Sequence, residues 1–434
     1  MRYTMRRELP TRVQLSGVAV IAALGSCVRL THAQCMYEAE VMPWPAGYQV
    51  VTAKDMNESG VIVGKRRVQG GSLLQSAFRW SSKEGYVTLP APPIGAAAWE
   101  ATRIDAEGNI VGGVDVPGPP NLFLEIVRWP SAERGGGVQL LSAGDSTKSY
   151  AIFGLLSDGS TVGYIQNSVA QDYPRPFYWR DGGFLTFPEP LASSTFALFT
   201  CVHPSGWAGG GMGVPTPVPT EYFSVLWHPG GEVQVIDLLP SPQYGIERIA
   251  ALDRHGRACI LAYAFVPRVF GVVLRSFYWN GSELTPIGPS QGAEYTTGAG
   301  MNELGQVIGR TGVVGGADSL NYPFIWQNGQ FTDLRTLTTL PEGFKLNWGL
   351  KPLNNGMLFC DATNRGKFIG VILRPQTTAE DVNVDCTVNE LDLGFIFEEW
   401  GSVDALSVRR ADVNGDGFVD AYDLGAVLGA WTPR

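Results

Sequence analysis

Short runs of alternating hydrophobic and polar residues recur along the chain from about residue 48 to residue 375. In one copy, Phe78 and Trp80 flank Arg79, and this alternation places both aromatic rings on one face of an extended strand. Each complete copy holds four such runs, and a tight turn that ends in glycine, as at 57–60, separates the first two. Such a turn between alternating runs is typical of a β-hairpin. The pattern therefore predicts repeated units of four antiparallel strands.

The repeat has a period of about fifty residues. Successive turn glycines are 47 to 51 positions apart, and they are Gly60, Gly108, Gly159, Gly206, Gly256, Gly305 and Gly356. Six copies carry a tryptophan in the third run, which we interpret as packing: Trp80, Trp129, Trp179, Trp227, Trp279 and Trp326. Four strands in this length match one blade of a β-propeller, whereas a solenoid coil is much shorter. The sequence predicts a mainly β fold, with a seven-bladed β-propeller over residues 35–375.

The seventh copy ends after its third run, near Arg374, and lacks a fourth. The segment 37–43 lies where such a run belongs, because Met42 precedes Gly60 by 18 residues and Leu89 precedes Gly108 by 19. We expect this N-terminal segment to complete the seventh unit. A closure of this kind removes the open sheet edges at both ends.

The repeated pattern A…(I/M)N..G.(I/V)VG…(A/S)F.W…L resembles the HAF family of extracellular repeats. The resemblance covers most of residues 48–375. It implies an exported, propeller-like repeat protein, and it brings no catalytic site with it.

The segment 381–392 reads DVNVDCTVNELD, and it recurs 31 residues later, at 412–423, as DVNGDGFVDAYD. Oxygen-bearing side chains occupy positions 1, 3, 5, 9 and 12 of both copies, and position 7 offers a backbone carbonyl. The expected ligands are Asp381, Asn383, Asp385, Thr387, Asn389 and Asp392 in the first loop, and Asp412, Asn414, Asp416, Phe418, Asp420 and Asp423 in the second. This spacing wraps a hard cation that prefers six to eight oxygens. The sequence therefore predicts two EF-hand-like calcium sites.

Apolar residues at helical spacing follow both loops: Leu393, Ile396, Phe397 and Trp400 after the first, and Leu424, Val427, Leu428 and Trp431 after the second. This stripe predicts two short helices that pack together. The loops and helices resemble a type I dockerin domain, which has Asp at position 12. We expect a small α-helical calcium-binding module at 381–434, after a linker at 376–380. The resemblance implies attachment to a cohesin-like or other surface protein, and a role in the capture or breakdown of polysaccharide.

Two features of the loops depart from the dockerin pattern. Cys386 stands at position 6 of the first loop, where a sharp turn favours glycine, so we expect lower calcium affinity there. Positions 10 and 11 are Glu390-Leu391 and Ala421-Tyr422, rather than the Ser/Thr pairs of many cellulosomal dockerins. Binding to a cohesin is therefore implied by the family and not by these residues.

Charge is concentrated at the C-terminal end. Residues 377–434 contain twelve acidic and three basic residues, so this segment carries the whole formal net charge of −9. A local acidic segment indicates cations as partners, and the chain has no basic stripe that would indicate nucleic acid. Because an empty acidic module repels itself, we expect its folding to depend on bound metal.

The N-terminus is typical of an export signal. Arg2, Arg6, Arg7 and Arg12 precede an apolar run, and cleavage after Ala33 would remove a signal peptide at 1–33. An alternative is a lipoprotein signal, with Cys27 acylated and the protein anchored to a membrane. We expect a secreted, extracellular or cell-surface protein. No later stretch has the length and apolarity of a membrane span.

Five cysteines follow the predicted cleavage site: Cys35, Cys201, Cys259, Cys360 and Cys386. An odd number at wide spacing is not a disulfide framework and holds no CxxC metal motif. We interpret most of them as small apolar residues in strands.

The sequence singles out no catalytic group. His203 and His255 fall in tight turns, and His228 follows a strand, all typical of surface histidines. A GxSxG string at 288–292 lacks the strand-turn-helix context of a nucleophile elbow. Turn carboxylates such as Asp105, Asp237 and Asp253 form no distinctive pair. Whether the chain is an enzyme stays open, and the sequence favours a protein that is not one.

A ligand-binding face is easier to propose. The longer loops of a propeller emerge together on one face, and we expect aromatic residues there to stack on sugar rings or to grip peptides. These residues are Trp44, Trp99, Tyr173, Tyr244, Tyr295, Tyr322 and Trp348. They could instead anchor their own loops.

The sequence therefore favours a secreted, calcium-binding, non-catalytic adhesion protein, whose propeller binds an extracellular ligand such as a polysaccharide. One alternative is a polysaccharide-degrading enzyme, similar to glycoside hydrolases, with an unrecognised carboxylate pair. Another is a structural protein of the cell envelope.

Overall fold

The computed structural model describes most of the chain from Cys35 to Trp431. The described residues are 35–68, 75–93, 98–117, 122–131, 138–141, 148–156, 158–167, 175–180, 183–185, 196–214, 221–228, 232–236, 244–266, 271–288, 293–314, 321–402 and 410–431. The predicted signal peptide at 1–33, including Cys27, lies outside them. Among the described residues, no helix has the length and apolarity needed to cross a membrane.

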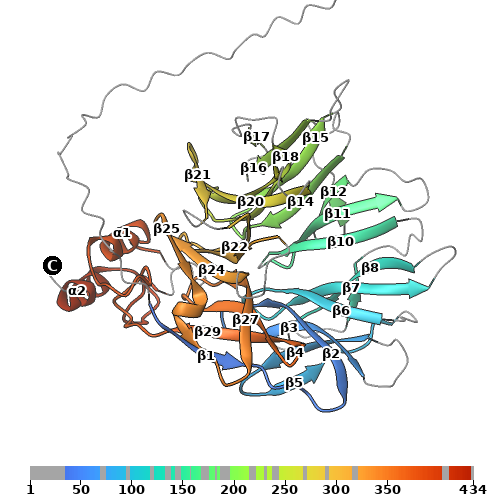
Figure 1. The fold of residues 1–434 in the computed structure, drawn as a ribbon, viewed down its shortest axis with the longest axis horizontal. Coiled ribbons are helices and arrows are strands. Elements are labelled where there is room, and N and C mark those ends of the chain that lie inside the picture. The colour runs from blue at the N-terminus through green and yellow to red at the C-terminus, as the bar shows by residue number, and fades with distance from the viewer. Residues whose placement is uncertain are drawn as a thin grey trace, which may run out of the picture.

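Antiparallel strands follow the sequence repeat and fan out around a common centre, as in a β-propeller (Figure 1). We number the repeat units 1 to 7 by their turn glycines. The strands of units 1 to 3 are β2 (Tyr48–Met56), β3 (Ile62–Val68), β4 (Gln75–Ser81), β5 (Gly85–Thr88), β6 (Ala98–Ile104), β7 (Ile110–Pro117), β8 (Leu122–Trp129), β9 (Gln139–Leu140), β10 (Lys148–Leu155), β11 (Thr161–Asn167), β12 (Arg175–Arg180) and β13 (Gly183–Leu185). A single parallel pair, between Gln75 and Ala98, links units 1 and 2 into one eight-stranded sheet.

Units 4 to 6 each form a separate four-stranded sheet. Their strands are β14 (Phe196–Val202), β15 (Ala208–Val214), β16 (Glu221–Trp227), β17 (Val233–Ile236), β18 (Tyr244–Leu252), β19 (Ala258–Val266), β20 (Gly271–Trp279), β21 (Leu284–Ile287), β22 (Tyr295–Met301), β23 (Val307–Gly312), β24 (Tyr322–Gln327) and β25 (Gln330–Asp333). A 3₁₀ turn (Leu334–Thr336) follows. Unit 7 contributes β27 (Phe344–Pro352), β28 (Leu358–Asn364) and β29 (Lys367–Pro375).

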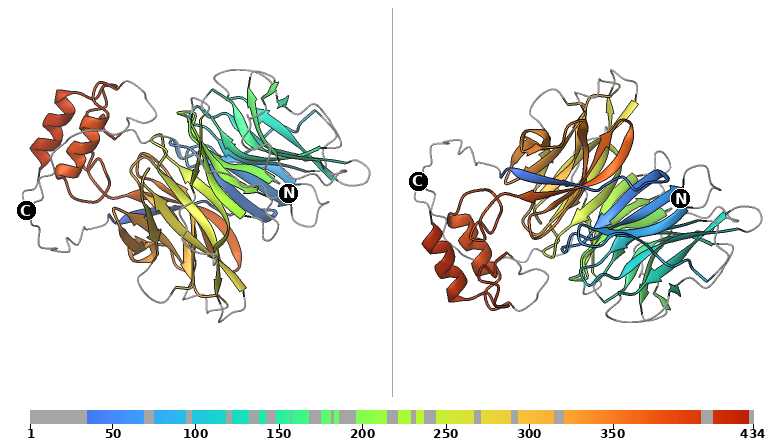
Figure 2. Two further views of the ribbon diagram at one scale, coloured as in Figure 1. Left: turned by 90° about the horizontal axis from the view of Figure 1, so that it is seen from above. Right: turned by 90° about the horizontal axis from the view of Figure 1, so that it is seen from below.

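The N-terminal segment completes the sheet of unit 7. Strand β1 (Tyr37–Val41) pairs antiparallel with β29, from Tyr37 opposite Pro375 to Val41 opposite Val371 (Figure 2). The short strand β26 (Thr338–Thr339) then pairs with β1 in parallel. The predicted closure is confirmed: chain segments more than 300 positions apart share one sheet.

Two recurrent residues have the roles that their positions predict. The seven turn glycines all have positive φ, between 72° and 93°, a region that costs other residues energy. The six repeated tryptophans are at most 8% exposed. The buried clusters combine residues of neighbouring units, such as Val63 of unit 1 with Ala101 of unit 2. The hydrophobic core therefore lies between adjacent sheets.

A β-bulge occurs at the same place in the innermost strand of every unit. The skipped residues, six positions before each turn glycine, are Lys54, Thr102, Phe153, Thr200, Ala250, Ala299 and Leu350. In five units a strand glycine lies against the chain next to the bulge: a Cβ on Gly112 would be 1.8 Å from the carbonyl oxygen of Glu100. The others are Gly64, Gly163, Gly210 and Gly309. This contact gives a steric reason for the glycine of the repeated VG motif.

The C-terminal module contains the helices α1 (Glu390–Glu398) and α2 (Ala421–Ala430), which pack beside the propeller-like body (Figure 2). Its core includes Val382, Ile396, Val419 and Val427. The expected apolar stripe is only half correct. Leu393, Ile396, Leu424 and Val427 pack inward, whereas Phe397, Trp400 and Leu428 are 59%, 47% and 52% exposed. Each helix buries little more than one line of side chains, which leaves the rest of the stripe at the surface.

Candidate functional site

The first acidic loop folds back on its own carboxylates. Asp381 accepts hydrogen bonds from the backbone N–H groups of Asp385 (3.1 Å) and Cys386 (2.8 Å). Asn383 Oδ1 accepts from the Asp385 N–H at 2.9 Å, and Asp385 accepts from the Thr387 N–H at 3.0 Å. The side chains at positions 1, 3 and 5 therefore converge on the centre of the turn.

The second loop repeats these contacts at equivalent positions. Asp412 accepts from the N–H groups of Asp416 (3.1 Å) and Gly417 (2.9 Å). Asn414 accepts from the Asp416 N–H at 2.8 Å, and Asp416 from the Phe418 N–H at 3.0 Å. Two segments 31 positions apart thus adopt one loop geometry, as their sequences predict.

Positions 9 and 12 link each loop to the helix that follows. Asn389 and Asp420 are the N-caps of α1 and α2, and they accept from the N–H groups two residues later. In return, Asp392 and Asp423 accept from the N–H groups of their caps at 2.8 Å. This reciprocal capping box fixes the position 12 carboxylate over the loop.

The donor set of the first loop fits a hard divalent cation. Its carboxylates are buried: Asp381 is 1% exposed, Asp385 3% and Asp392 0%. Burial, and the charges of Asp381 and Asp385, raise the pKa of Asp392 to about 6. A cation of charge +2 would offset this repulsion, and oxygen-only ligands in a twelve-residue loop suit Ca²⁺.

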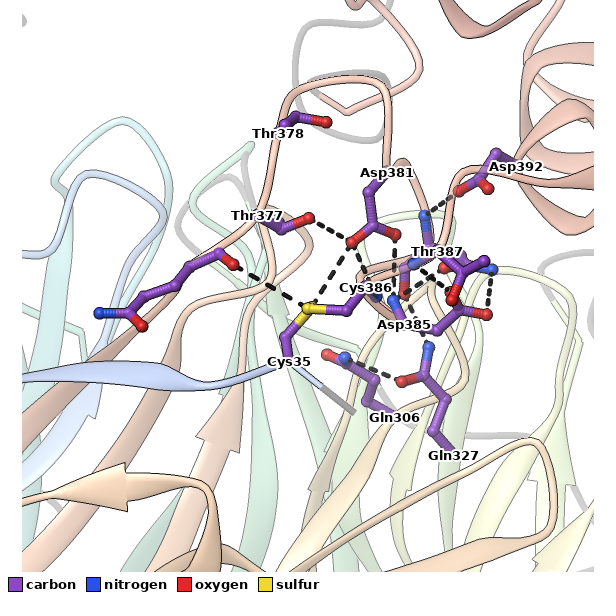
Figure 3. The surroundings of a disulfide bond; sticks show 12 residues. Cys35, Gln306, Gln327, Thr377, Thr378, Asp381, Asp385, Cys386, Thr387 and Asp392 are labelled. Atoms are coloured by element: carbon purple, nitrogen blue, oxygen red, sulfur yellow. Dashed lines mark hydrogen bonds between the residues drawn. A yellow bond between two sulfur atoms is a disulfide. The ribbon is translucent and has the colours of Figure 1, made fainter. Parts of the chain in front are cut away.

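The two loops differ in their surroundings. Asn414 and Asp416 of the second loop are exposed, whereas Asn383 and Asp385 are covered by the propeller-like body. Gln327 of β24 donates to the Asn383 carbonyl at 2.7 Å, and its own side-chain oxygen accepts from Gln306 at 3.2 Å (Figure 3). The first loop is therefore part of an interface, and the second faces solvent.

A disulfide bond joins Cys35 to Cys386, with the two Cα atoms 5.0 Å apart (Figure 3). The sequence did not predict this bond, because it interpreted most of the five cysteines as small apolar residues in strands. Among the described residues, Cys201, Cys259 and Cys360 are free and buried, as expected. Cys386 has a φ of 64°, so position 6 does require the left-handed conformation that glycine tolerates best. The carboxylate of Asp381 lies beside the two sulfur atoms, but sulfurs in a disulfide are not thiolate ligands.

Charged contacts attach the module elsewhere. Arg254, in the turn of unit 5, forms an ion pair with Glu399 after α1, and His255 Nε2 lies 2.9 Å from Glu398 Oε1. Arg410 reaches between the two parts and donates to the carbonyls of Asn355 (3.0 Å) and Val382 (3.1 Å). These contacts attach the module through Arg410 beside the first loop and through Glu398 and Glu399 at the C-terminal end of α1.

The predicted aromatic ligand residues are not gathered on free loops. Trp99 and Trp348 lie within β6 and β27, contrary to expectation, and are partly buried. Tyr295 and Tyr322 begin β22 and β24, where Tyr295 donates to Asn321 at 3.0 Å and the Arg335 guanidinium lies 4.6 Å from the Tyr322 ring centroid. Tyr244 begins β18, but its side chain lies outside the described residues, as does all of Tyr173. Most of these aromatics anchor their own strands.

Trp44 is the predicted ligand residue that lines a cavity of about 340 Å³ beside β2 and the β28–β29 turn. Lys367 Nζ lies 4.6 Å from its ring centroid, and Phe368 beside it is 58% exposed. Asp361 also lines this cavity, and burial raises the pKa of its carboxyl to about 6. Aromatic surface next to a polar group can hold a small polar ligand.

The histidines and carboxylates of the turns have structural partners. His203 Nε2 lies 2.5 Å from Glu303 Oε1. Burial alone would raise the pKa of Glu303, but His203 and Arg254 outweigh it and lower that pKa. His228 packs against Trp207, and Asp105 and Asp253 accept N–H groups of their own turns. Asp237 and most of the GxSxG string lie outside the described residues.

Comparisons with known proteins agree with the division of the chain into a repeat region and a C-terminal module. The family model of the dockerin type I domain matches residues 379–428. Type I dockerin domains bind calcium, and dockerins bind cohesins. No curated protein sequence matches the chain.

Two solved structures illustrate the likeness of the repeat region. One is the β-propeller domain of the Trilobed protease from Pyrococcus furiosus, at 9% identity and a TM-score of 0.44, covering 76% of this chain and 94% of that one. Another is the polysaccharide lyase Uly1, at 10% identity and a TM-score of 0.46, covering 79% and 97%. Neither likeness bears on the activity of this chain.

Proposed function

We propose that this chain is a secreted or cell-surface adhesion protein that attaches to a partner through a calcium-loaded dockerin module. The observation that carries the proposal is the pair of acidic loops with one hydrogen-bond pattern, each capping a helix, over residues 381–392 and 412–423. We propose one Ca²⁺ in each loop. The body attached to this module would be a seven-bladed propeller with HAF-type repeats, closed by β1.

The partner surface lies on the outer side of the module. Its exposed large apolar side chains are Leu391, Phe397, Trp400, Phe418, Tyr422 and Leu428. Tyr422 is 76% exposed, and Phe397 and Trp400 stack with centroids 6.1 Å apart. Exposed aromatic residues of this kind are enriched where proteins bind proteins. Because the first loop is covered by the propeller, the partner meets the second loop and α2.

Calorimetric titration of the full-length protein with a panel of purified cohesin modules tests this attachment. We expect calcium-dependent binding that EDTA abolishes. The double substitution Tyr422→Ser and Leu428→Ser should weaken it at least about tenfold, since two exposed anchors are lost. The matched control is Phe368→Ser, an aromatic residue on the propeller that is 58% exposed, which should leave affinity unchanged. Binding that survives both EDTA and the double substitution would contradict the proposal.

The cavity beside Trp44 supports a second part of the proposal, in which the propeller holds a polysaccharide chain. A glycan array with the full-length protein and a Trp44→Ala variant tests it. If the Trp44→Ala variant loses glycan signals that the unchanged protein gives, binding at this cavity is supported. Release of shorter products from a bound glycan would favour a polysaccharide-degrading enzyme instead, and the absence of any glycan signal would favour a structural role in the cell envelope.

Export is tested by sequencing the N-terminus of the protein recovered from its native source. Cleavage after Ala33 leaves Gln34 first, whereas lipoprotein processing leaves an acylated Cys27. Protein that retains residues 1–33 would contradict both routes.

A further inference from the structure

The centre of the propeller contains a second cavity, of about 320 Å³, on the side of the tight turns. Residues from the innermost strands of all seven units line it. The bulge in each strand brings two successive residues to this wall, five and six positions before the turn glycine. A cavity of this volume can hold a small ligand.

Charge is distributed unevenly around this ring. At the position five residues before the turn glycine, units 7, 1 and 2 carry Lys351, Asp55 and Arg103 side by side. The same position in units 3 to 6 carries the small residues Gly154, Cys201, Ala251 and Gly300. Lys54, one residue earlier in unit 1, adds another cation to the charged arc. These two positions of units 7, 1 and 2 therefore contribute three cations and one anion to the cavity wall.

The anion is already paired. Asp55 Oδ1 accepts from Lys351 Nζ at 2.8 Å, and Asp55 Oδ2 accepts from the Ile104 N–H at 3.0 Å. Lys351 also donates to the Met56 carbonyl at 3.0 Å. These contacts satisfy Asp55 and Lys351 within the protein, where they join the units that close the ring.

The remaining cations keep free donors. Arg103 uses Nε and Nη1 on the carbonyls of Phe153 (2.8 Å) and Thr102 (2.7 Å), which holds its guanidinium in place. Its Nη2, and the ammonium of Lys54, have no partner among the described residues. A fixed guanidinium next to a free ammonium is suited to a carboxylate.

The rim carboxylates of the cavity are occupied. Glu58 accepts from the backbone N–H groups of Asn354 (2.9 Å) and Asn355 (3.2 Å), and Asp105 accepts from the N–H and side chain of Asn109. Glu303 is paired with His203. Their oxygens accept hydrogen bonds from neighbouring turns, so they leave Arg103 and Lys54 available to a ligand.

The opposite wall is apolar. Phe153, Ala250 and Ala299, the skipped bulge residues of units 3, 5 and 6, line it together with the small residues of units 3 to 6, and Thr200 of unit 4 adds one hydroxyl. We propose that this cavity binds a small carboxylic acid. Its carboxylate would contact Arg103 and Lys54, and the apolar part of the ligand would pack against units 3 to 6. This site is separate from the calcium loops and from the cavity beside Trp44.

The test compares two probes of the same shape, 3-phenylpropionate and 3-phenylpropanol, by calorimetric titration of the full-length protein. We expect the acid to bind at least about tenfold more tightly than the alcohol, because only the acid forms charge-assisted hydrogen bonds. Added salt should weaken binding of the acid and leave binding of the alcohol unchanged.

Lys54→Gln should reduce affinity for the acid about tenfold, and it should fold normally because Lys54 has no partner among the described residues. The matched control, Lys83→Gln in an exposed turn of unit 1, should leave affinity unchanged. The melting temperature of each variant verifies folding. Equal binding of acid and alcohol, no binding of either, or unchanged affinity in Lys54→Gln would overturn the proposal. Loss of cohesin binding is not expected in any of these variants, so this site and the proposed attachment succeed or fail separately.

Discussion

Cys35 and Cys386 form a disulfide across 351 positions of sequence, and the bond ties a residue two positions before β1 to position 6 of the first acidic loop. The same β1 closes the sheet of unit 7. One short segment therefore holds together the two ends of the repeat region and the C-terminal module. The module is consequently docked on the body rather than suspended from a linker.

The disulfide predicts a thiol count. In the oxidised chain from Cys35 onward, denaturation should expose three reactive thiols, from Cys201, Cys259 and Cys360, and reduction should raise the count to five. Without denaturant these three should react slowly, because burial raises the pKa of each thiol, that of Cys259 to about 12. Thiol titration with a coloured disulfide reagent measures all three states. Five reactive thiols in the oxidised, denatured chain would exclude the bond.

The bond also predicts non-additive mutations. Cys35→Ser and Cys386→Ser should each lower the free energy of unfolding of the C-terminal module by about 2–4 kcal/mol, and the double variant should lower it no further. Cys386→Gly in the Cys35→Ser background should recover about 1 kcal/mol over Cys386→Ser, because glycine suits a φ of 64°. Chemical denaturation followed by circular dichroism gives these values. Additive losses would mean that the two cysteines act independently.

Calcium removal should affect the two loops unequally. With EDTA, we expect residues 410–431 to become sensitive to protease first, because the second loop faces solvent. The first loop should stay protected by Gln327 and the disulfide, whereas the sequence alone predicts that folding of the whole module depends on bound metal. Limited proteolysis with mass spectrometry measures the order. The control is Asp412→Ala, which should reduce calcium stoichiometry from two to one and reproduce the EDTA pattern for α2 only. Simultaneous cleavage of both loops would contradict this order.

Asp361 predicts a pH dependence of stability. Its pKa in the folded chain, about 6, lies above the ordinary 3.8 because of burial, so the folded state holds the proton more tightly. The free energy of unfolding should therefore increase as pH falls from about 6 to about 4. Asp361→Asn should stabilise the protein at pH 7 by about 1–3 kcal/mol and make no difference below pH 4. Melting temperatures of both proteins between pH 4 and pH 8 test this, and parallel curves would refute it.

The strand glycines predict a steric effect. Gly112→Ala would place a Cβ 1.8 Å from the Glu100 carbonyl oxygen, so it should destabilise the protein by about 2–3 kcal/mol. Gly394→Ala is the control, since nothing lies within 4 Å of that position in helix α1. It should stabilise the helix by about 0.5–1 kcal/mol. Thermal denaturation of both variants gives the comparison, and equal effects would argue against the close contact.

The sequence by itself determined the features that depend on local periodicity. The seven-fold spacing of turn glycines, the buried tryptophans and the shared geometry of the two acidic loops all follow from residues a few positions apart. Pairing of β1 with β29 was also predictable, because the repeat lacked one strand and the N-terminal segment supplied one. Such features need only the chain's own pattern, since backbone hydrogen bonding and side-chain alternation fix them.

Only the tertiary structure decided the contacts between units. The partner of Cys386 was not predictable, because it depends on where the N-terminus lies after closure of the ring. The docking of the first loop on Gln327, and the partial burial of Trp99 and Trp348, likewise depend on the packing of neighbouring sheets. In the central cavity, Lys351, Asp55 and Arg103 meet although they lie some 50 to 300 residues apart in sequence. Their proximity arises from the ring, and no local pattern encodes it.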